Sequence, residues 1–485
     1  MWSPAPENGT LFIDGKWRPA VSRATFETRN PATSELLAQI SDGGLDDARE
    51  AIAAASAAAA AWAARTAYSR AAVLAEAHRL MLARADDLAL LMTSEQGKPL
   101  RAARNEVGYA GDFLQWFAEE AKRVYGTTIP SARGDQRFFT MQQPVGVVAA
   151  ITPWNYPVSM ITRKVGPALA AGCTVVLKPA EQTPLCAVAT FQLLQDAGLP
   201  PGVCNLITAS RPEAVGNALL TSETVRKLTF TGSTEVGKQL AARAAATVKR
   251  VSLELGGHAP FIVFGDADAA HAAKGASLVK FLNTGQACIS PNRILVQRDL
   301  YPAFLEVLAQ RVANLRAGNG AEPGVTIGPL IDDQAIAKME RHVNDAVQKG
   351  ARLLSGGRRL SGGGHDRGTF FAPTLLADVT PDMLIYREET FGPVAAVTPF
   401  DDEAEAMEMA NDTAYGLASY VYTRDLSRAI RVCEALRFAI VGINDINPTS
   451  AAAPFGGMKE SGMGREGGRD GISEYLETKL VGVST

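Results

Sequence analysis

The sequence has few cysteines, and their spacing does not suit a disulfide framework or a zinc ribbon. Only five occur in 485 residues, and no two stand as a C-x-x-C pair. We therefore expect free thiols and no metal site. An excess of positive charge is also absent, because 48 basic and 51 acidic residues leave a net charge of -3. Nothing in that balance attracts phosphate backbones or anionic lipid, so we expect no nucleic-acid or membrane partner.

Long apolar runs are missing as well. No stretch approaches the roughly 18 residues that a membrane span needs. Residues 1–10 carry an acid and no basic residue, unlike a secretory signal. These absences predict a cytoplasmic protein. The length and the ordinary globular composition, with 47% hydrophobic and 20% charged residues, indicate a chain that folds into several domains.

The spacing of hydrophobic residues changes along the chain. Helical patterns at 45–64, 69–95 and 101–124 predict a helical beginning. From Gln142 onwards short apolar runs alternate with helical stretches, as parallel βαβ units require. A second stretch of this kind covers about 266–441 and has its own core-forming residues. The sequence therefore predicts an α/β protein with a doubly wound sheet and a second α/β domain.

A glycine motif follows one of the predicted strands. Residues 232–239, GSTEVGKQ, nearly match the phosphate loop of nucleotide hydrolases, but Gln239 stands where a Mg²⁺-binding hydroxyl is required. We therefore reject that reading. A glycine turn between a strand and a helix can still receive a pyrophosphate at the helix N-terminus. A plain turn with no ligand is the alternative that the motif alone leaves open.

Three residues far apart in the sequence have the chemistry of a nucleophilic site. Cys288 lies in FLNTGQACIS, Glu254 lies in the apolar segment LELGG, and Asn155 lies between two prolines in TPWNYP. A thiol needs a nearby base or an electropositive site before it can react as a thiolate. A carboxylate costs free energy to bury unless it has a partner or a catalytic role. An amide can donate hydrogen bonds that stabilise an oxyanion. Each residue also has a purely structural alternative. Cys288 can be a small buried apolar residue, Glu254 can pair with an arginine, and Asn155 can close a turn.

Together these segments resemble the aldehyde dehydrogenase superfamily over essentially the whole chain. The motifs occur in the family's order: PWN at Asn155, KPAEQTP at Lys178, FTGSTEVG at Gly232, LELGG at Glu254, NTGQAC at Cys288, ETFGP at Glu389 and PFGG at 454–457. The resemblance implies that the Cys288 thiolate attacks an aldehyde, that Asn155 and the backbone N–H of Cys288 hold the oxyanion, and that Glu254 activates water to release the acid.

The resemblance also implies a nicotinamide cofactor. It assigns cofactor contacts to Trp154, Lys178, Glu181, Gly232, Ser233, Leu255, Glu389 and Phe391. Because a glutamate accepts a ribose hydroxyl and repels a 2′-phosphate, Glu181 predicts that NAD is preferred and NADP is possible. A cysteine thiol is mostly protonated at neutral pH, so the site must lower its pKa or pass its proton to a base, and the sequence leaves both options open.

The substrate expected from the resemblance is succinate semialdehyde. In that branch an arginine matching Arg163 and a serine near Ser450 hold the distal carboxylate, and Phe455 is also expected to contact the substrate. Leu282 stands where the branch usually has a second arginine, and His258 with Ser290–Pro291 is similar to 2-oxoglutarate semialdehyde dehydrogenases. Another acidic aldehyde is therefore an alternative. A thiol hydrolase or acyltransferase without a cofactor, or a binding protein with a disabled site, are alternatives from other classes.

Finally, the resemblance implies domain limits. It predicts a Rossmann-like NAD-binding domain at 1–125 and 144–255 and a catalytic domain at 256–441. Residues 442–471 are expected to return to the NAD-binding domain and to line the substrate entrance. Segments 126–143 and 472–485 are expected to form a small β oligomerisation element, giving a homodimer or a homotetramer.

Overall fold

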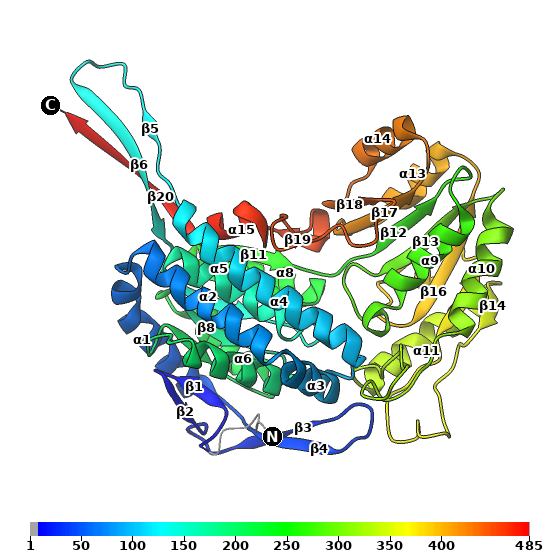
Figure 1. Ribbon diagram of the computed structural model, residues 1–485, viewed down its shortest axis with the longest axis horizontal. Helices are drawn as coiled ribbons and strands as arrows, with labels where there is room; N and C mark the ends of the chain where they lie inside the picture. The colour runs from blue at the N-terminus through cyan, green and yellow to red at the C-terminus, as the bar shows by residue number, and fades with distance from the viewer. Residues whose placement is uncertain (1–7, 485) are drawn as a thin grey trace.

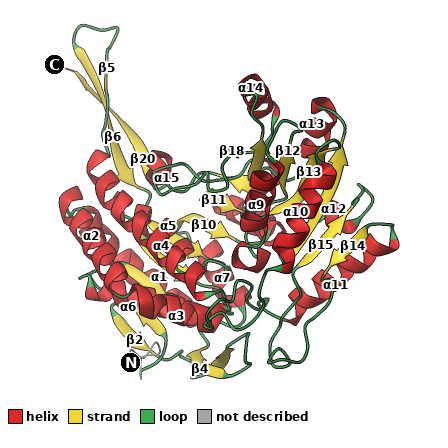
Figure 2. Cartoon of the chain, turned by 45° about the vertical axis from the view of Figure 1, so that its right-hand side comes forward, coloured by secondary structure: helices red, strands yellow, loops and turns green. Residues whose placement is uncertain are grey.

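Two largely parallel β-sheets, each covered by helices on both faces, form the body of the protein. The computed structural model describes residues 8–484, so the predicted limits at residues 1 and 485 lie outside the described residues (Figures 1 and 2). The expected α/β class is confirmed. No helix among residues 8–484 is long and apolar enough to cross a membrane.

The first sheet has eight strands. Its order is β19 (Gly462–Met463), β11 (Arg250–Glu254), β10 (Val225–Thr231), β7 (Val147–Ile151), β8 (Thr174–Lys178), β9 (Cys204–Leu206), β1 (Leu11–Ile13) and β2 (Lys16–Arg18). The five central strands, β11 to β9, are parallel, and the flanking pairs are antiparallel. The chain runs outward from β7 through β8 to β9 and then returns to β10 on the other side of β7. This reversal creates a topological switch point between β7 and β10.

Both faces of this sheet are buried, which explains the continuous apolar runs in the sequence. One face packs on α2 (Ala67–Ala83), α3 (Ala85–Gln96), α4 (Leu100–Glu120), α5 (Ser159–Ala171) and α6 (Pro184–Asp196). The other packs on α1 (Leu45–Ala63), α7 (Pro212–Thr221) and α8 (Thr234–Ala244). The alanine-rich run becomes α1, whose buried Ala48, Ala51 and Ala55 allow close contact with the sheet.

Two expectations about the first hundred residues are wrong. The described chain begins with strands, because β1 and β2 add to the sheet edge and β3 (Thr25–Arg29) pairs with β4 (Leu36–Ser41). These strands have three to six residues and too little alternation to be recognised. The predicted helix at 69–95 is two helices, broken at Arg84. Asp86 and Asp87 then stand in the first turn of α3, where acids favour a helix start.

The second sheet has seven strands and a similar reversal. Its order is β14 (Arg352–Ser355), β15 (Thr374–Ala377), β16 (Val394–Phe400), β13 (Pro291–Gln297), β12 (Ala259–Val263), β17 (Ala418–Tyr422) and β18 (Ile440–Ile443). All strands except β14 run parallel to their neighbours. Phe261 and Val263 face one apolar cluster with α9 (Ala269–Lys280) and α10 (Tyr301–Ala313), while Ile262 faces another with α13 (Glu403–Asn411) and α14 (Leu426–Ala435).

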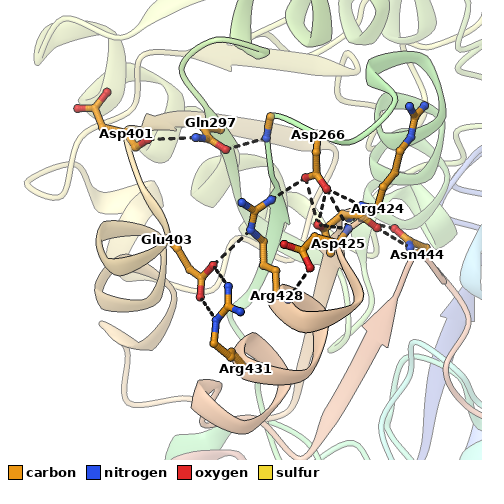
Figure 3. A network of polar contacts seen from close by, with 11 residues as sticks. Asp266, Gln297, Asp401, Glu403, Arg424, Asp425, Arg428, Arg431 and Asn444 are labelled. Atoms are coloured by element: carbon orange, nitrogen blue, oxygen red, sulfur yellow. Dashed lines mark hydrogen bonds and ion pairs between the residues drawn. The ribbon is translucent and has the colours of Figure 1, made fainter.

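A polar network fixes α14 against this sheet (Figure 3). The Asp266 carboxylate accepts hydrogen bonds from Thr423 Oγ1 and from the backbone N–H groups of Arg424 and Asp425. Arg428 on α14 joins Asp266 at 2.8 Å to Glu403 on α13 at 3.2 Å. Partial burial raises the pKa of Asp266, but these donors more than offset burial and hold it below its usual value.

A third sheet stands apart from the body. It contains β5 (Thr128–Ile129), β6 (Gln136–Pro144) and β20 (Leu476–Ser484), and it extends from the first sheet's side as an arm (Figure 1). β6 and β20 pair antiparallel along nine residues, from Leu476 opposite Pro144 to Ser484 opposite Gln136.

Candidate active site

The switch point of the first sheet opens into one cavity of about 280 Å³, which is completed by loops of the second domain that precede β13 and β16. Ligands of open α/β sheets bind at the carboxyl ends of strands where the strand order reverses, and the loops after β7, β10 and β11 all contribute here. The lining residues are Pro153, Trp154, Asn155, Met160, Thr231, Gly232, Ser233, Glu254, Leu255, Gly256, Cys288, Ala335, Lys338, Met339, Glu389, Thr390 and Phe391. Asn155, Glu254 and Cys288, separated by up to 133 residues in the sequence, therefore share one cavity.

The loop before Cys288 has an unusual backbone. Asn283, Thr284 and Gly285 take positive φ angles of 48°, 60° and 76° in succession. Only glycine adopts this region freely, so the loop must be held by its surroundings. Thr284 Oγ1 accepts a hydrogen bond from Gly328 N at 2.9 Å, and a Cβ on Gly285 would collide with the carbonyl oxygen of Gly392.

A shared carbonyl joins this loop to the turn after β7. The Nδ2 groups of Asn155 and Asn283 donate to the carbonyl oxygen of Gln286 at 3.1 and 3.2 Å. Asn283 Nδ2 also donates to the carbonyl oxygen of Asn155 at 2.9 Å. The Asn155 amide is therefore held two residues before Cys288, and because an amide has two hydrogens, one is left for a ligand.

Glu254 ends β11 and is buried. A Cβ on Gly456 would lie only 2.9 Å from Glu254 Oε1, so the glycine makes room for the carboxylate. Glu254 Oε2 has no hydrogen-bond partner among the described residues. Burial, followed by the charge of Glu466, raises the pKa of Glu254 well above its usual value, while Arg163 and Lys164 oppose the shift. Such a carboxylate accepts a proton more readily than an exposed glutamate does.

The thiol has a raised pKa too. Burial raises the pKa of Cys288 to about 12, and the Arg163 charge only partly offsets it. Of the two options left open by the sequence, lowering the thiol pKa or transferring its proton, the protein's own residues therefore favour transfer. Glu254 is a carboxylate in the same cavity, and its raised pKa makes it a better proton acceptor than an exposed glutamate.

The other half of the cavity suits a dinucleotide. Ser233 caps α8, accepting from Val236 N at 3.4 Å, and the first N–H groups of a helix point toward any anion placed before it. Glu389 accepts from Gly257 N at 2.9 Å, and a Cβ on Gly256 would stand 2.9 Å from its Oε2. The rings of Trp154 and Phe391 meet edge to face at 5.5 Å.

Five predicted site residues lie outside the lining. Lys178 is buried and pairs with Glu181 at 3.3 Å, and Glu181 is half exposed. Arg163 is only 2% exposed, pairs with Glu466 Oε2 at 2.9 Å and stacks on the Phe455 ring at 4.0 Å. Ser450 is exposed. The structure thus gathers the catalytic candidates more completely than the substrate candidates.

Some residues around the site were not predicted from the sequence. Lys338 and Met339 reach the cavity from α11 (Asp333–Gln348), and an amphipathic helix gave no sign of this role. Lys164 pairs with Glu466 and contacts Thr229 Oγ1 at 3.1 Å. Nothing in the sequence showed that Glu466 pairs with Lys164, 302 residues away. Among residues 8–484 no cluster of side chains could hold a metal ion.

Comparisons with known proteins agree with this site. The aldehyde dehydrogenase family matches residues 17–481. The chain is 52% identical to a glutarate-semialdehyde dehydrogenase of Pseudomonas putida, covering 98% of this chain and 97% of that protein. It is 53% identical to a succinate-semialdehyde dehydrogenase [NADP(+)] of Escherichia coli, covering 97% and 96%. A crystal structure titled as an E. coli NADP-dependent enzyme superposes with a TM-score of 0.96 at 51% identity, covering 99% and 98%.

The chain therefore belongs to the aldehyde dehydrogenase family, as its motifs predicted. It is an aldehyde-oxidising enzyme, and the expected reaction class is confirmed.

The raised thiol pKa gives a first prediction. Alkylation of the cofactor-free protein by iodoacetamide should be slow at pH 7 and should keep rising above pH 9, because only the thiolate reacts and its fraction grows until the pH reaches the pKa. Mass spectrometry of the Cys288 peptide measures the rate across pH. Cys433, which is exposed, serves as the internal control. A Cys288 rate that levels off below pH 7 would contradict the prediction.

Proposed function

We propose that the protein oxidises an aldehyde carrying a distal carboxylate to the dicarboxylic acid, with Cys288 as nucleophile. The observation that carries the proposal is that Asn155, Glu254 and Cys288 share a cavity with Ser233 and Glu389. Thiol, amide and base thus stand beside a strand–helix turn suited to a pyrophosphate.

In the first step the Cys288 sulfur bonds to the aldehyde carbon, and the carbonyl oxygen becomes an oxyanion. The free hydrogen of the Asn155 amide and the backbone N–H of Cys288 donate to it. The thiol proton leaves to a base, for which Glu254 is suited by its raised pKa. Attack, oxyanion stabilisation and proton removal are therefore provided by three residues of one cavity.

NAD(P), when bound, supplies the oxidation by accepting hydride. In this chain Ser233 and the start of α8 would hold the pyrophosphate, and Glu389 and Lys338 would hold the neighbouring ribose. The substrate carbon is then a thioester on Cys288. Glu254 releases the thiol proton to solvent and then takes a proton from water, the hydroxide attacks the thioester, and the acid leaves as the thiolate is regenerated.

Two findings support an acidic substrate. The relatives named above act, by their names, on succinate and glutarate semialdehydes, which both carry a distal carboxylate. The cluster of Arg163, Lys164 and Glu466 holds two cations and one anion, which leaves one positive charge behind Phe455. We propose that Arg163 attracts the distal carboxylate. Leu282, 36% exposed, offers no second anchor, so length discrimination between acidic aldehydes should be weak.

The proposal predicts a substrate ranking. With NAD, kcat/KM for succinate, glutarate and 2-oxoglutarate semialdehydes should exceed that for propanal. Arg163→Met should reduce the acidic aldehydes' kcat/KM by about tenfold or more, the worth of a charge-assisted hydrogen bond, and should affect propanal much less. Initial rates of NADH absorbance measure both.

Cys288→Ala should abolish the reaction and serves as the baseline. An equal loss for charged and uncharged aldehydes would show that Arg163 acts through the fold. Ester hydrolysis without NADH formation from any aldehyde would instead favour a thiol hydrolase and would overturn the proposed function.

We further propose that NAD is preferred over NADP. Glu181 lies beside the charge of Lys178 and can accept a ribose hydroxyl, whereas a 2′-phosphate there would meet its carboxylate. Glu181→Gln should therefore raise the ratio of kcat/KM for NADP to that for NAD. Glu213→Gln, which removes another acid near Lys178, is a matched control. A wild-type ratio at or above one would refute the preference.

The arm supports self-association. Phe139, Met141 and Val483 are exposed, and strand alternation with the register of β6 and β20 places them on one face. We propose that this face meets a second copy in a homodimer or homotetramer. Phe139→Asp with Val483→Asp should lower the sedimentation mass. Thr478→Asp, on the same arm but without an apolar side chain, is the control. An unchanged mass in the double variant would refute the interface.

A further inference from the structure

A buried ion pair underlies the turn that carries Asn155. Lys98 follows the left-handed Gly97 at the end of α3, and Glu106 lies on α4. Their side chains are fully buried and paired to each other. Burial lowers the pKa of Lys98, and the Glu106 charge opposes that shift. Because removing two charges from water costs free energy, a buried pair needs further hydrogen bonds beyond the ion pair itself. The groups that form those hydrogen bonds with Lys98 and Glu106 indicate what the pair stabilises.

All the remaining polar contacts of the pair go to one turn. Lys98 Nζ donates to the carbonyl oxygen of Asn155 at 2.8 Å and lies 3.8 Å from the centre of the Tyr156 ring. Glu106 Oε1 accepts from the backbone N–H groups of Val158 and Ser159 at 3.0 and 3.1 Å. The turn is therefore held at both ends by one cation and one anion.

The same chain segment also braces the cysteine loop. Leu100 N donates to the carbonyl oxygen of Gly320 at 2.9 Å, and a Cβ on Gly328 would collide with the carbonyl oxygen of Gly97. Gly328 is in turn hydrogen-bonded to Thr284, four residues before Cys288. The segment 97–100 thus contacts the Asn155 turn directly and the cysteine loop through Gly328. The segment itself lies outside the cavity lining.

We propose that Lys98, fixed by Glu106, is a positioning residue for the oxyanion-binding amide of Asn155. The inference rests on the proposed role of Asn155. The carbonyl of Asn155 has two donors, Lys98 Nζ and Asn283 Nδ2, which together set the plane of the backbone from which the side chain leaves. Loss of one donor lets the turn relax, and the amide no longer meets the oxyanion at the distance that stabilisation requires.

A double-mutant cycle tests this role. Lys98→Met and Asn155→Ala are made separately and together. Lys98→Met should lower kcat by about 10- to 100-fold, with much smaller changes in KM for aldehyde and NAD, because misplaced donors weaken transition-state binding. The double variant should be no slower than Asn155→Ala alone, since both changes remove one function. Iodoacetamide alkylation of Cys288, which forms no oxyanion, should keep its rate in Lys98→Met.

Lys249→Met is the matched control. Lys249 is also buried and donates to backbone carbonyls, those of Ser222 and Val225, on a side of the sheet that does not touch the turn. It should leave kcat close to the wild-type value. If Lys98→Met fails to fold, the pair Lys98→Met with Glu106→Gln leaves no unpaired buried charge and removes the same contact to Asn155.

Three results would overturn the inference. The first is a fold-loss of kcat in the double variant that equals the product of the two single fold-losses. The others are an unchanged kcat in Lys98→Met and a loss of kcat in Lys249→Met as large as that in Lys98→Met. Hydrolysis of p-nitrophenyl acetate separates this inference from the proposed function, because it needs the oxyanion site and no cofactor. If the wild type hydrolyses the ester but oxidises no aldehyde, the proposed function fails, and the cycle is judged on ester hydrolysis. Wild-type protein with neither activity overturns both.

Discussion

The site depends on the hydrogen bond from the Asn155 amide to the carbonyl of Gln286. It is one short contact between segments 131 residues apart, and it ties the end of a strand in one sheet to the loop that carries the nucleophile under the other. The cavity that holds both the thiol and the amide takes its lining from residues of both sheets' domains. The reversal of strand order in the first sheet places the Asn155 turn at the carboxyl ends of its strands, the loop before β13 brings Cys288 to the same place, and this bond fixes their relative position.

Burial sets the chemistry of this arrangement. A cavity that excludes water strengthens the interaction of every dipole aimed at a developing charge, but burial also keeps the Cys288 thiol protonated until a base takes its proton. The cations near the cavity are themselves paired: Arg163 and Lys164 share Glu466, which leaves one positive charge in that cluster, and Lys98 pairs with Glu106. The nucleophile therefore lies among paired charges, and its proton has to pass to a base, a role that the raised pKa of Glu254 suits.

The sequence predicts the centre of the site better than its surroundings. Cys288, Glu254 and Asn155 could be predicted because each lies in a short motif whose residue types indicate a chemical role. The order of these motifs is also the order found in one family. Lys98 and Lys338 could not, because a lysine on a helix or in a turn looks like a surface charge until tertiary packing buries it. Arg163 was recognised without Glu466, since pairing across 303 residues has no local signal. The short strands β1 to β4 were missed because they gain stability from neighbours rather than from their own pattern.

The position of Glu466 and β19 late in the chain has a consequence for biosynthesis. β19 closes the edge of a sheet whose other central strands were made some 200 residues earlier, and Glu466 neutralises cations already enclosed by α5. A nascent chain that has released the strands up to β18 still holds Arg163 and Lys164 without this partner. The active geometry can therefore form only after residues 462–466 have left the ribosome.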